Sequence, residues 1–470
     1  MKKVASVLLS TLMAASLVAC GTSTSSGTPS AAPAATEAPA AAATEAPTAE
    51  PAAAATEEGK VLNIYCWNEE FKSRLEDHFP GYEKVDATSG KIGDVTVKFT
   101  ITPSTDNAYQ NKLDEVLPAN ASAAADDKVD IFLVEADYAL KYTGASPAVA
   151  LDVKGDLGLT DADLANQYQY TKDVVTADGI LRGTSWQGCP GVLIYNREAA
   201  KEVFGSDDPE TVQAKVKDWA TFNATAAEVN AKGYLMTSTV NDAYRVYSNN
   251  VTSKWVENGK INIDPNIMKW VEDSKALVDA GYTTTAELWS DDWNKGFYPE
   301  GKVFCYFGPA WLINFSMKSD DAASIAAKGG WGAVEGPQGF NWGGTWICGA
   351  QGSDNPTLVA EIMKQLTCNE SVMADIVKKD SDFVNNKPAM EAAAKDDSYA
   401  FAVLGGQNPL AMFTAGADKI SMSNITIYDQ GCTEEFQKAM KNYFDGNATL
   451  DESLDLFYKG VEEKYPELTH

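Results

Sequence analysis

Histidine is nearly absent from this chain. Only His78 and His470 occur among its 470 residues. Ser–His and Cys–His catalytic pairs, and zinc centres that combine cysteine with histidine, need this residue beside a nucleophile or a second ligand. No cysteine lies near either histidine in the sequence, so we expect no metal site and no catalysis of these kinds.

Cysteines occur, but not in the paired spacing that binds metals or exchanges disulfides. The chain has seven, and none forms a CxxC pair. They are Cys20, Cys66, Cys189, Cys305, Cys348, Cys368 and Cys432. Several lie inside apolar runs, as Cys305 does in Val303–Tyr306, which favours buried free thiols. Cys20 stands in a different context, at the end of the N-terminal apolar segment.

Basic residues are few relative to acidic ones. The chain has 38 Lys and Arg against 66 Asp and Glu, a formal charge of −28 at pH 7. We therefore expect no nucleic-acid partner, and an anionic membrane surface would repel the chain. The G-x-x-x-x-G-K-[ST] loop that cradles phosphates is also missing, and no cofactor is expected. We interpret the acidity as a solvated surface.

The N-terminus carries an export signal. Lys2 and Lys3 precede the apolar or small residues 4–18, a segment too short to span a bilayer as a mature helix. It ends in Leu17-Val18-Ala19-Cys20, which resembles the lipobox of bacterial lipoproteins. The resemblance implies that residues 1–20 are a lipoprotein signal peptide with lipidation at Cys20. The protein would then be lipid-anchored to the outer face of the cytoplasmic membrane.

Residues 21–59 contain almost only Ala, Thr, Pro, Ser, Gly and Glu, with T-E-A-P repeated at Thr36 and Thr44. Such a segment cannot bury a core, so we expect a disordered tether. The remaining chain is too long for one compact core, which predicts two domains.

Strands and helices alternate from Lys60 onward. Val61–Cys66, Val95–Ile101 and Ile131–Val134 are expected strands, and apolar residues at a spacing of four predict helices between them. This order predicts an α/β fold with a parallel sheet and right-handed crossovers.

Polar and aromatic residues follow the ends of these strands. They are Trp67, Asn68, Glu69, Asp106, Glu135 and Asp137. For Glu69 and Asp106, ligand binding and helix capping are equal alternatives. Glu135 and Asp137 favour ligand binding, because one cap does not explain two acids directly after a buried strand.

A second strand of this kind lies in Phe297–Trp311. Lys302–Phe307 predicts a strand buried on both faces, and Gly308-Pro309 ends it. Trp311 then lies just beyond the carboxyl end, where open α/β sheets bind small ligands. The alternative is a core aromatic.

The order of several motifs is similar to that of extracellular solute-binding proteins of ABC importers, in the carbohydrate-binding family 1, which is maltose-binding-protein-like. The matching segments are Val192–Asn196, Asp218–Phe222, Phe297–Trp311, Trp331–Pro337 and Gly343–Trp346. Cys305 stands where the family commonly has Met or another apolar residue. Together the segments cover nearly all of residues 60–468.

The resemblance implies a periplasmic-binding-protein-like fold with two α/β lobes and a hinge crossed about three times. We place the crossings near Asp178, Ala333 and Asn385. The first lobe is then expected at residues 60–177 and 334–383. The second lobe is expected at residues 178–331 and 386–468.

The resemblance also implies an oligosaccharide held between the lobes by a monomer that delivers it to membrane permease subunits, without catalysis. Trp and Tyr rings cover sugar faces, and polar side chains satisfy the hydroxyls. The expected site residues are Trp67, Asn68, Glu69, Asp106, Glu135, Asp137, Trp186, Gln187, Arg245, Trp293, Trp311, Trp342 and Trp346. Trp289 and Trp293 are four apart, and one of the two is expected to pack instead. For Arg245, a surface ion pair is an equal alternative.

Two other functions remain open at this point. A secreted glycoside hydrolase needs two carboxylates across the scissile bond, and the chain has acids enough for that. A surface adhesin or sensor would bind sugar without transport.

Overall fold

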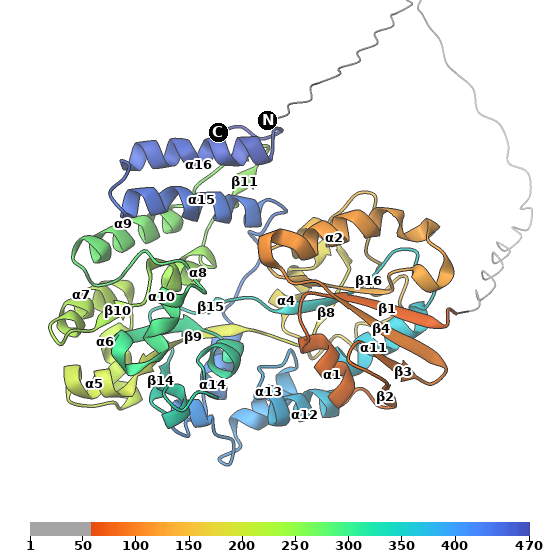
Figure 1. The fold of residues 1–470 in the computed structure, drawn as a ribbon, viewed down its shortest axis with the longest axis horizontal. Helices are drawn as coiled ribbons and strands as arrows, with labels where there is room; N and C mark the ends of the chain where they lie inside the picture. The colour runs from red at the N-terminus through yellow and green to blue at the C-terminus, as the bar shows by residue number, and fades with distance from the viewer. Residues whose placement is uncertain (1–57) are drawn as a thin grey trace, which may run out of the picture. The chain divides into compact units, whose positions relative to one another are not determined.

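The computed structural model describes residues 58–470 (Figure 1). The expected signal peptide, Cys20 and all but the end of the expected tether lie outside these residues. Two sheets organise the described part, and we call the elements around them the first and the second lobe.

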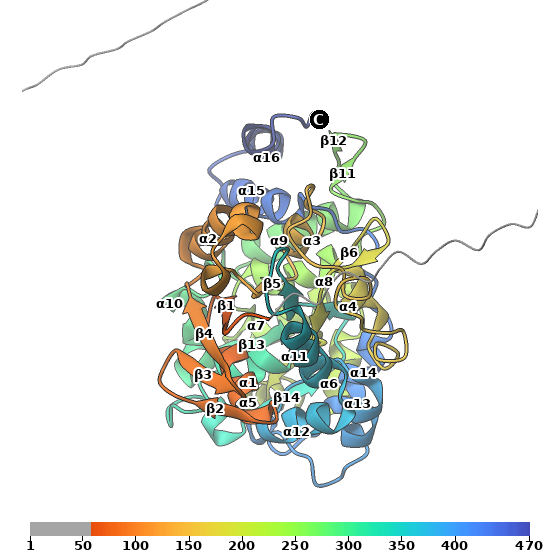
Figure 2. The same ribbon diagram turned by 90° about the vertical axis from the view of Figure 1, so that its right-hand side faces the viewer.

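The first lobe is built on a seven-stranded sheet with the order β2-β3-β4-β1-β5-β16-β8. Its strands are β1 (Val61–Cys66), β2 (Tyr82–Lys84), β3 (Ser89–Ile92), β4 (Val95–Ile101), β5 (Ile131–Glu135), β8 (Thr184–Ser185) and β16 (Thr345–Gly349). β1 pairs in parallel with β4 and β5, so the expected parallel arrangement is confirmed. The hairpin β2–β3 lies at the outer edge of this sheet (Figure 2). Its helices are α1 (Glu70–His78), α2 (Ala108–Val116), α3 (Ala139–Thr143), α4 (Gln169–Asp173), α11 (Pro356–Cys368) and α12 (Glu370–Asp380).

The second lobe is built on the sheet β10-β13-β9-β14, with β15 also paired to β9. Its strands are β9 (Pro190–Asn196), β10 (Leu235–Thr237), β13 (Val303–Gly308), β14 (Trp331–Val334) and β15 (Phe340–Asn341). Every residue of β13 is buried, which confirms the strand expected there. Two-stranded ribbons are formed by β6 (Thr176–Ala177) with β7 (Ile180–Leu181) and by β11 (Val256–Glu257) with β12 (Lys260–Ile261).

The remaining helices follow in chain order. They are α5 (Arg197–Phe204), α6 (Pro209–Val216), α7 (Trp219–Asn230), α8 (Tyr244–Ser248), α9 (Pro265–Asp279), α10 (Asp291–Asn294), α13 (Lys387–Ala394), α14 (Leu410–Ala417), α15 (Asp429–Phe444) and α16 (Leu450–Lys464). Local sequence sets several ends. The Asn196 side chain caps α5, and Gly205 ends it with φ +76°. α15 and α16 lie side by side at one end of the second lobe (Figure 1).

The chain passes between the two sheets three times. The first passage runs from β8 to β9 and the second from β15 to β16. Both come later than the crossings expected near Asp178 and Ala333, because β8 and β15 extend each sheet toward the hinge. The third lies between α12 and α13 and includes Asn385, whose backbone N–H donates to Trp186 O at 2.7 Å.

One apolar core cluster extends through both lobes, and a second joins α8, α9, α15 and α16. All six cysteines within residues 58–470 are free thiols, and all but the half-buried Cys368 are buried, as expected. None of the helices in this part of the chain has the length and apolar character needed to cross a membrane.

Candidate functional site

A cleft of about 800 Å3 is lined by residues of both lobes. The turn after β1 contributes Trp67, Asn68 and Glu69, and Glu135 at the end of β5 and Asp137 in the turn after it also line the cleft. The second lobe contributes Arg245, Trp289 and Trp311. The passages between the sheets contribute Gln187, Trp342 and the glycines 343–344. Most of the expected site residues therefore lie together, at the carboxyl ends of first-lobe strands and at the hinge.

Three tryptophans form one continuous aromatic surface, which we call the Trp wall: Trp289, Trp311 and Trp342. The ring centroids of Trp289 lie 6.1 Å from Trp311 and 5.9 Å from Trp342, and those of Trp311 and Trp342 are 5.1 Å apart. Trp311 Nε1 donates to Trp342 O at 3.0 Å, which fixes that ring. Trp289 is 51% exposed, so its ring offers free area to a ligand.

Trp67 supplies a fourth ring from the first lobe. It packs edge-on against Tyr109 and Tyr138, with centroids 5.6 and 6.4 Å away. The Tyr109 hydroxyl oxygen lies 2.9 Å from Tyr65 O and 2.8 Å from Leu133 O, so its one hydrogen is shared by carbonyls of β1 and β5 and anchors this support to both strands. Phe315, which is 60% exposed, adds an apolar ring to the lining.

An ion pair joins the two lobes across the cleft. The Arg245 guanidinium on α8 donates to both carboxylate oxygens of Asp137, with Nη1 to Oδ1 at 2.5 Å. Beside it, Glu135 Oε2 accepts from the Asp137 backbone N–H at 2.8 Å. Burial, and then the charge of Asp137, raise the pKa of Glu135 to about 8. The guanidinium is thus bonded to Asp137, and its charge partly offsets the rise in the pKa of Glu135.

A second charged cluster lies where the first passage meets α1. Gln187 Nε2 donates to Glu70 Oε1 at 2.7 Å and to Asp382 Oδ2 at 3.0 Å. The buried Arg74 guanidinium lies 3.1 Å from Asp380 and 3.5 Å from Asp382. Burial, and then the charge of Asp382, raise the pKa of Glu70 to about 7. The cleft thus combines aromatic surface with carboxylate, amide and guanidinium groups.

Four expected site residues do not line the cleft. Trp186 is fully buried and stacks on Phe71, with centroids 5.7 Å apart. Trp346 is also buried, and its Nε1 donates to Thr171 O at 2.7 Å. Both rings fill the core between sheet and helices and leave no free face. Asp106 is exposed, outside the cleft lining, in a left-handed turn with φ +52°.

The fourth is Trp293. Of the two tryptophans that are four apart, Trp289 lines the cleft and Trp293 does not. Trp293 is fully buried, and its Nε1 donates to Asp242 Oδ1 at 2.7 Å. Ser290 caps α10 by accepting from the Trp293 N–H at 3.2 Å, so the helix begins after Trp289. Trp289 has φ +70° and lies outside it. The sequence signal was the cap Ser290 followed by two acids, which ends the helical register between the two tryptophans.

Sequence reasoning also missed Glu70, Ser73 and Arg74, which lie on α1 and line the cleft. They sit at the first turns of a helix that the apolar spacing had located. Their orientation into the cleft depends on how α1 meets the hinge, which no local pattern encodes. Within residues 58–470, no three His, Cys, Asp or Glu side chains are grouped so that they could hold a metal ion.

The family model for bacterial extracellular solute-binding proteins matches residues 83–403. Among solved structures, the chain is similar to an extracellular solute-binding protein of family 1, with TM-score 0.68 and 17% identity over 86% of this chain and 99% of that one. It is also similar to the ABC transporter associated binding protein from B. animalis subsp. lactis Bl-04 in complex with beta-1,6-galactobiose. That match has TM-score 0.64 and 19% identity over 87% of this chain and 99% of that one.

A third similar structure is the sugar-binding protein MalE from Xanthomonas citri, with TM-score 0.63 and 15% identity over 86% of this chain and 96% of that one. The comparison with curated proteins found no match. At these identities the structures establish the fold, which is periplasmic-binding-protein-like, as the motifs had implied. With the family model matching more than half of its length, the chain belongs to the bacterial extracellular solute-binding proteins.

Proposed function

We propose that the protein binds an oligosaccharide in the cleft and delivers it to the permease subunits of an ABC importer. The observation that carries this proposal is the Trp wall beside two clusters of carboxylate and guanidinium groups. Rigid aromatic rings cover the C–H faces of sugars, and charged or amide groups satisfy the hydroxyls that binding buries. The complexes of similar proteins with beta-1,6-galactobiose and with lacto-N-biose support the choice of ligand class.

The size of the cleft supports a ligand larger than a monosaccharide. Ligand pockets commonly measure about 300–1,000 Å3, and this cleft, at about 800 Å3, lies in the upper part of that range. Four tryptophans line the cleft, which is more aromatic surface than a single sugar ring can cover. We therefore propose several sugar subsites.

The test is a thermal-shift screen of plant, host and starch oligosaccharides, followed by calorimetry on those that raise the melting temperature. We expect at least one ligand with a dissociation constant near micromolar, or about −8 kcal/mol. If no oligosaccharide shifts the melting temperature and amino acids or peptides do, the proposed ligand class is wrong.

A glycoside hydrolase is the second candidate, because Glu70 and Glu135 have the raised pKa that a general acid needs. We favour binding without catalysis, since Asp137 is held by Arg245 and Glu70 by Gln187. Incubation of the protein with each ligand, followed by chromatography, separates the two. Intact sugar supports the binding protein, and shorter products support the hydrolase.

We further propose a monomer anchored through a lipid on Cys20 to the outer face of the cytoplasmic membrane. The lipobox-like sequence 17–20 and the tether composition support this location. If the acylated thiol is the anchor, Cys20→Ala should move the protein from the membrane fraction to the soluble one. A variant that still sediments with membranes would contradict the lipid anchor.

A further inference from the structure

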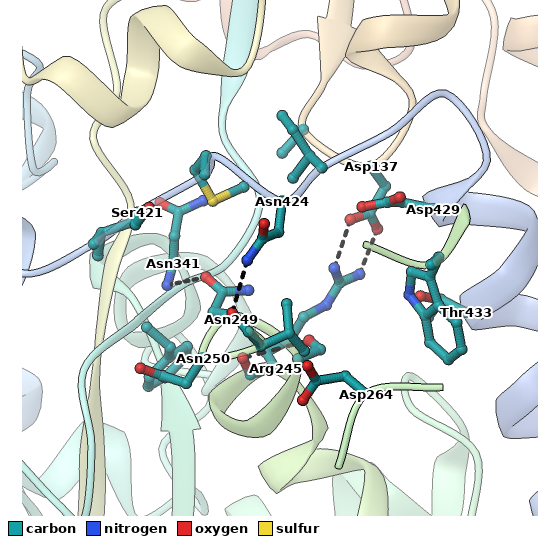
Figure 3. A pocket seen from close by; sticks show the side chains of 18 of the residues that line it. Asp137, Arg245, Asn249, Asn250, Asp264, Asn341, Ser421, Asn424, Asp429 and Thr433 are labelled. Carbon is teal, nitrogen blue, oxygen red and sulfur yellow. Dashed lines mark hydrogen bonds and ion pairs between the residues drawn. The ribbon is translucent and has the colours of Figure 1, made fainter. Parts of the chain in front are cut away.

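A second cavity of about 260 Å3 adjoins the cleft (Figure 3). We call it the side chamber. Its walls come from the end of α8 and the loop that follows, from residues 339–343 at the hinge, and from the 419–426 loop before α15. Asp137 and Leu140 of the first lobe close it. The side chamber therefore lies between the lobes, as the cleft does.

The cleft and the side chamber share a thin wall. Three residues line both cavities: Asp137, Arg245 and Gly343. The wall is thus an ion pair between two side chains, visible as two dashed lines in Figure 3, and a glycine without a side chain. Opening of the Asp137–Arg245 pair by a change of side-chain rotamer would therefore join the two cavities.

The lining of the side chamber differs from that of the cleft. Asn249 Oδ1 accepts from the Asn341 backbone N–H at 2.7 Å, and Asn424 Nδ2 donates to Val251 O at 2.9 Å. Within residues 58–470, no partner is found for the Asn249 amide nitrogen or the Asn424 amide oxygen. One donor and one acceptor group therefore remain for a guest, and Figure 3 shows both side chains in the lining.

Asp429 adds an acceptor. Its Oδ1 accepts from the backbone and hydroxyl of Thr426, at 2.9 and 2.5 Å, while no partner for Oδ2 is found in the described chain. Burial, opposed by those bonds and assisted by the charge of Asp137, raises the pKa of Asp429 to about 7. A carboxyl group so placed favours a neighbour that offers hydroxyl hydrogens.

The volume is larger than structural hydration requires. A liquid water molecule takes about 30 Å3, so the side chamber has room for roughly eight. Buried waters in proteins number about one per 27 residues. A chamber of this size with spare donors and acceptors is suited to a polar guest of about one sugar ring.

We propose that the side chamber is a second compartment for the ligand of the cleft and takes one hydroxyl-rich end unit of a longer oligosaccharide when the Asp137–Arg245 pair opens. This inference rests on the proposed function. The Trp wall would stack the other units in the cleft, and the carboxamides of Asn249 and Asn424 would satisfy the end unit. Longer ligands should therefore gain affinity from residues that shorter ligands never touch.

The test places a large side chain in the side chamber by a substitution in the 419–426 loop. Ser421 lines the side chamber, whereas Ser423 does not. Both are exposed, and their hydroxyls bond to each other at 3.0 Å, so a change at either loses the same bond. With an oligosaccharide series found in the ligand screen, Ser421→Trp should weaken binding of the longest members about tenfold or more. The shortest members should bind as to the wild type, and Ser423→Trp should leave the whole series unchanged.

Alkylation of a cysteine at position 421 gives a second readout, which does not depend on the conformation that the tryptophan ring adopts in Ser421→Trp. In Ser421→Cys, a bound long oligosaccharide should slow the reaction of position 421 with N-ethylmaleimide, followed by mass spectrometry of its peptide. A short one should not, and Ser423→Cys should react at one rate throughout. Equal affinities for Ser421→Trp together with no protection of Ser421→Cys would overturn the inference while leaving sugar binding in place. A wild type that binds no oligosaccharide would instead refute the proposed function, and the side-chamber assignment with it.

Discussion

Glu135 is the cleft residue at which protonation and stability are coupled. Its pKa is raised from the usual 4.5 to about 8, by burial first and by Asp137 second. Between these values the folded chain holds a proton that the unfolded chain has released. The contribution of Glu135 to stability therefore falls as pH rises from about 4.5 to 8, because at this group the folded state binds more protons than the unfolded state.

This coupling predicts the behaviour of Glu135→Gln. The amide has no charge to desolvate, so the variant should melt above the wild type at pH 8, and the gap should close as pH falls toward 5. Melting curves from pH 5 to 9 measure it. Glu69→Gln is the control, since that neighbouring carboxylate is 72% exposed, and it should follow the wild-type pH profile. A Glu135→Gln profile parallel to the wild type would contradict the coupling.

The tryptophans show how far residue types alone can locate a site. Trp67, Trp311 and Trp342 were found because each follows a strand end or a glycine-rich turn, and all three line the cleft. Trp186 and Trp346 follow the same rule but are buried. What separates them is whether a helix covers the ring, as Phe71 on α1 covers Trp186. That contact joins distant parts of the chain, so local sequence does not contain it.

At the scale of elements, the passage from β15 to β16 shapes the cleft floor. Gly343 has φ +74°, a region that residues with a Cβ enter at a cost of about 1–2 kcal/mol. An added Cβ would lie 3.4 Å from Trp311 Nε1 and 3.6 Å from Glu135 Oε1. It would thus fill space between the Trp wall and the Glu135 carboxyl group.

A matched pair of glycines separates backbone strain from cleft filling. Gly446 has the same φ of +74°, but nothing lies within 4 Å of an added Cβ. Gly343→Ala and Gly446→Ala should lose a similar 1–2 kcal/mol or so of stability. Only Gly343→Ala should also weaken ligand binding, by several-fold. A melting curve measures the stability of each variant, and calorimetric titration then measures its affinity for the ligand. Equal affinities in the two variants would contradict a place for Gly343 in the binding site.

Strands and helices with a recognisable pattern of apolar residues were predictable from the sequence, and elements too short to have one were not. β4 alternates apolar and polar residues over seven positions, and β1 is a six-residue run with Asn63 as its only strongly polar residue, which located both strands. β8 and β15 have two residues each, too few for any period. They are strands only because β16 and β9 lie beside them. For that reason the passages next to these two strands come later in the chain than the positions expected near Asp178 and Ala333.

For the whole molecule, the order of motifs predicted the family and the two-lobed fold. For Arg245 it left ligand binding and an ion pair as equal alternatives, and it could not predict that Asp137 on the other lobe would be the partner of such a pair. That pairing depends on how closely the lobes approach. It makes the ion pair both a link between lobes and the wall between the cleft and the side chamber.

The central claim is that an oligosaccharide binds on the Trp wall. The most direct test compares the affinities of Trp289→Asn and Ile427→Asn for the ligand found in the screen. Both side chains are 51% exposed, and only Trp289 lines the cleft. Asn also tolerates the positive φ of Trp289, so the fold should survive. We expect Trp289→Asn to bind about tenfold or more weakly and Ile427→Asn to bind as the wild type does. Unchanged affinity in a folded Trp289→Asn would contradict the account.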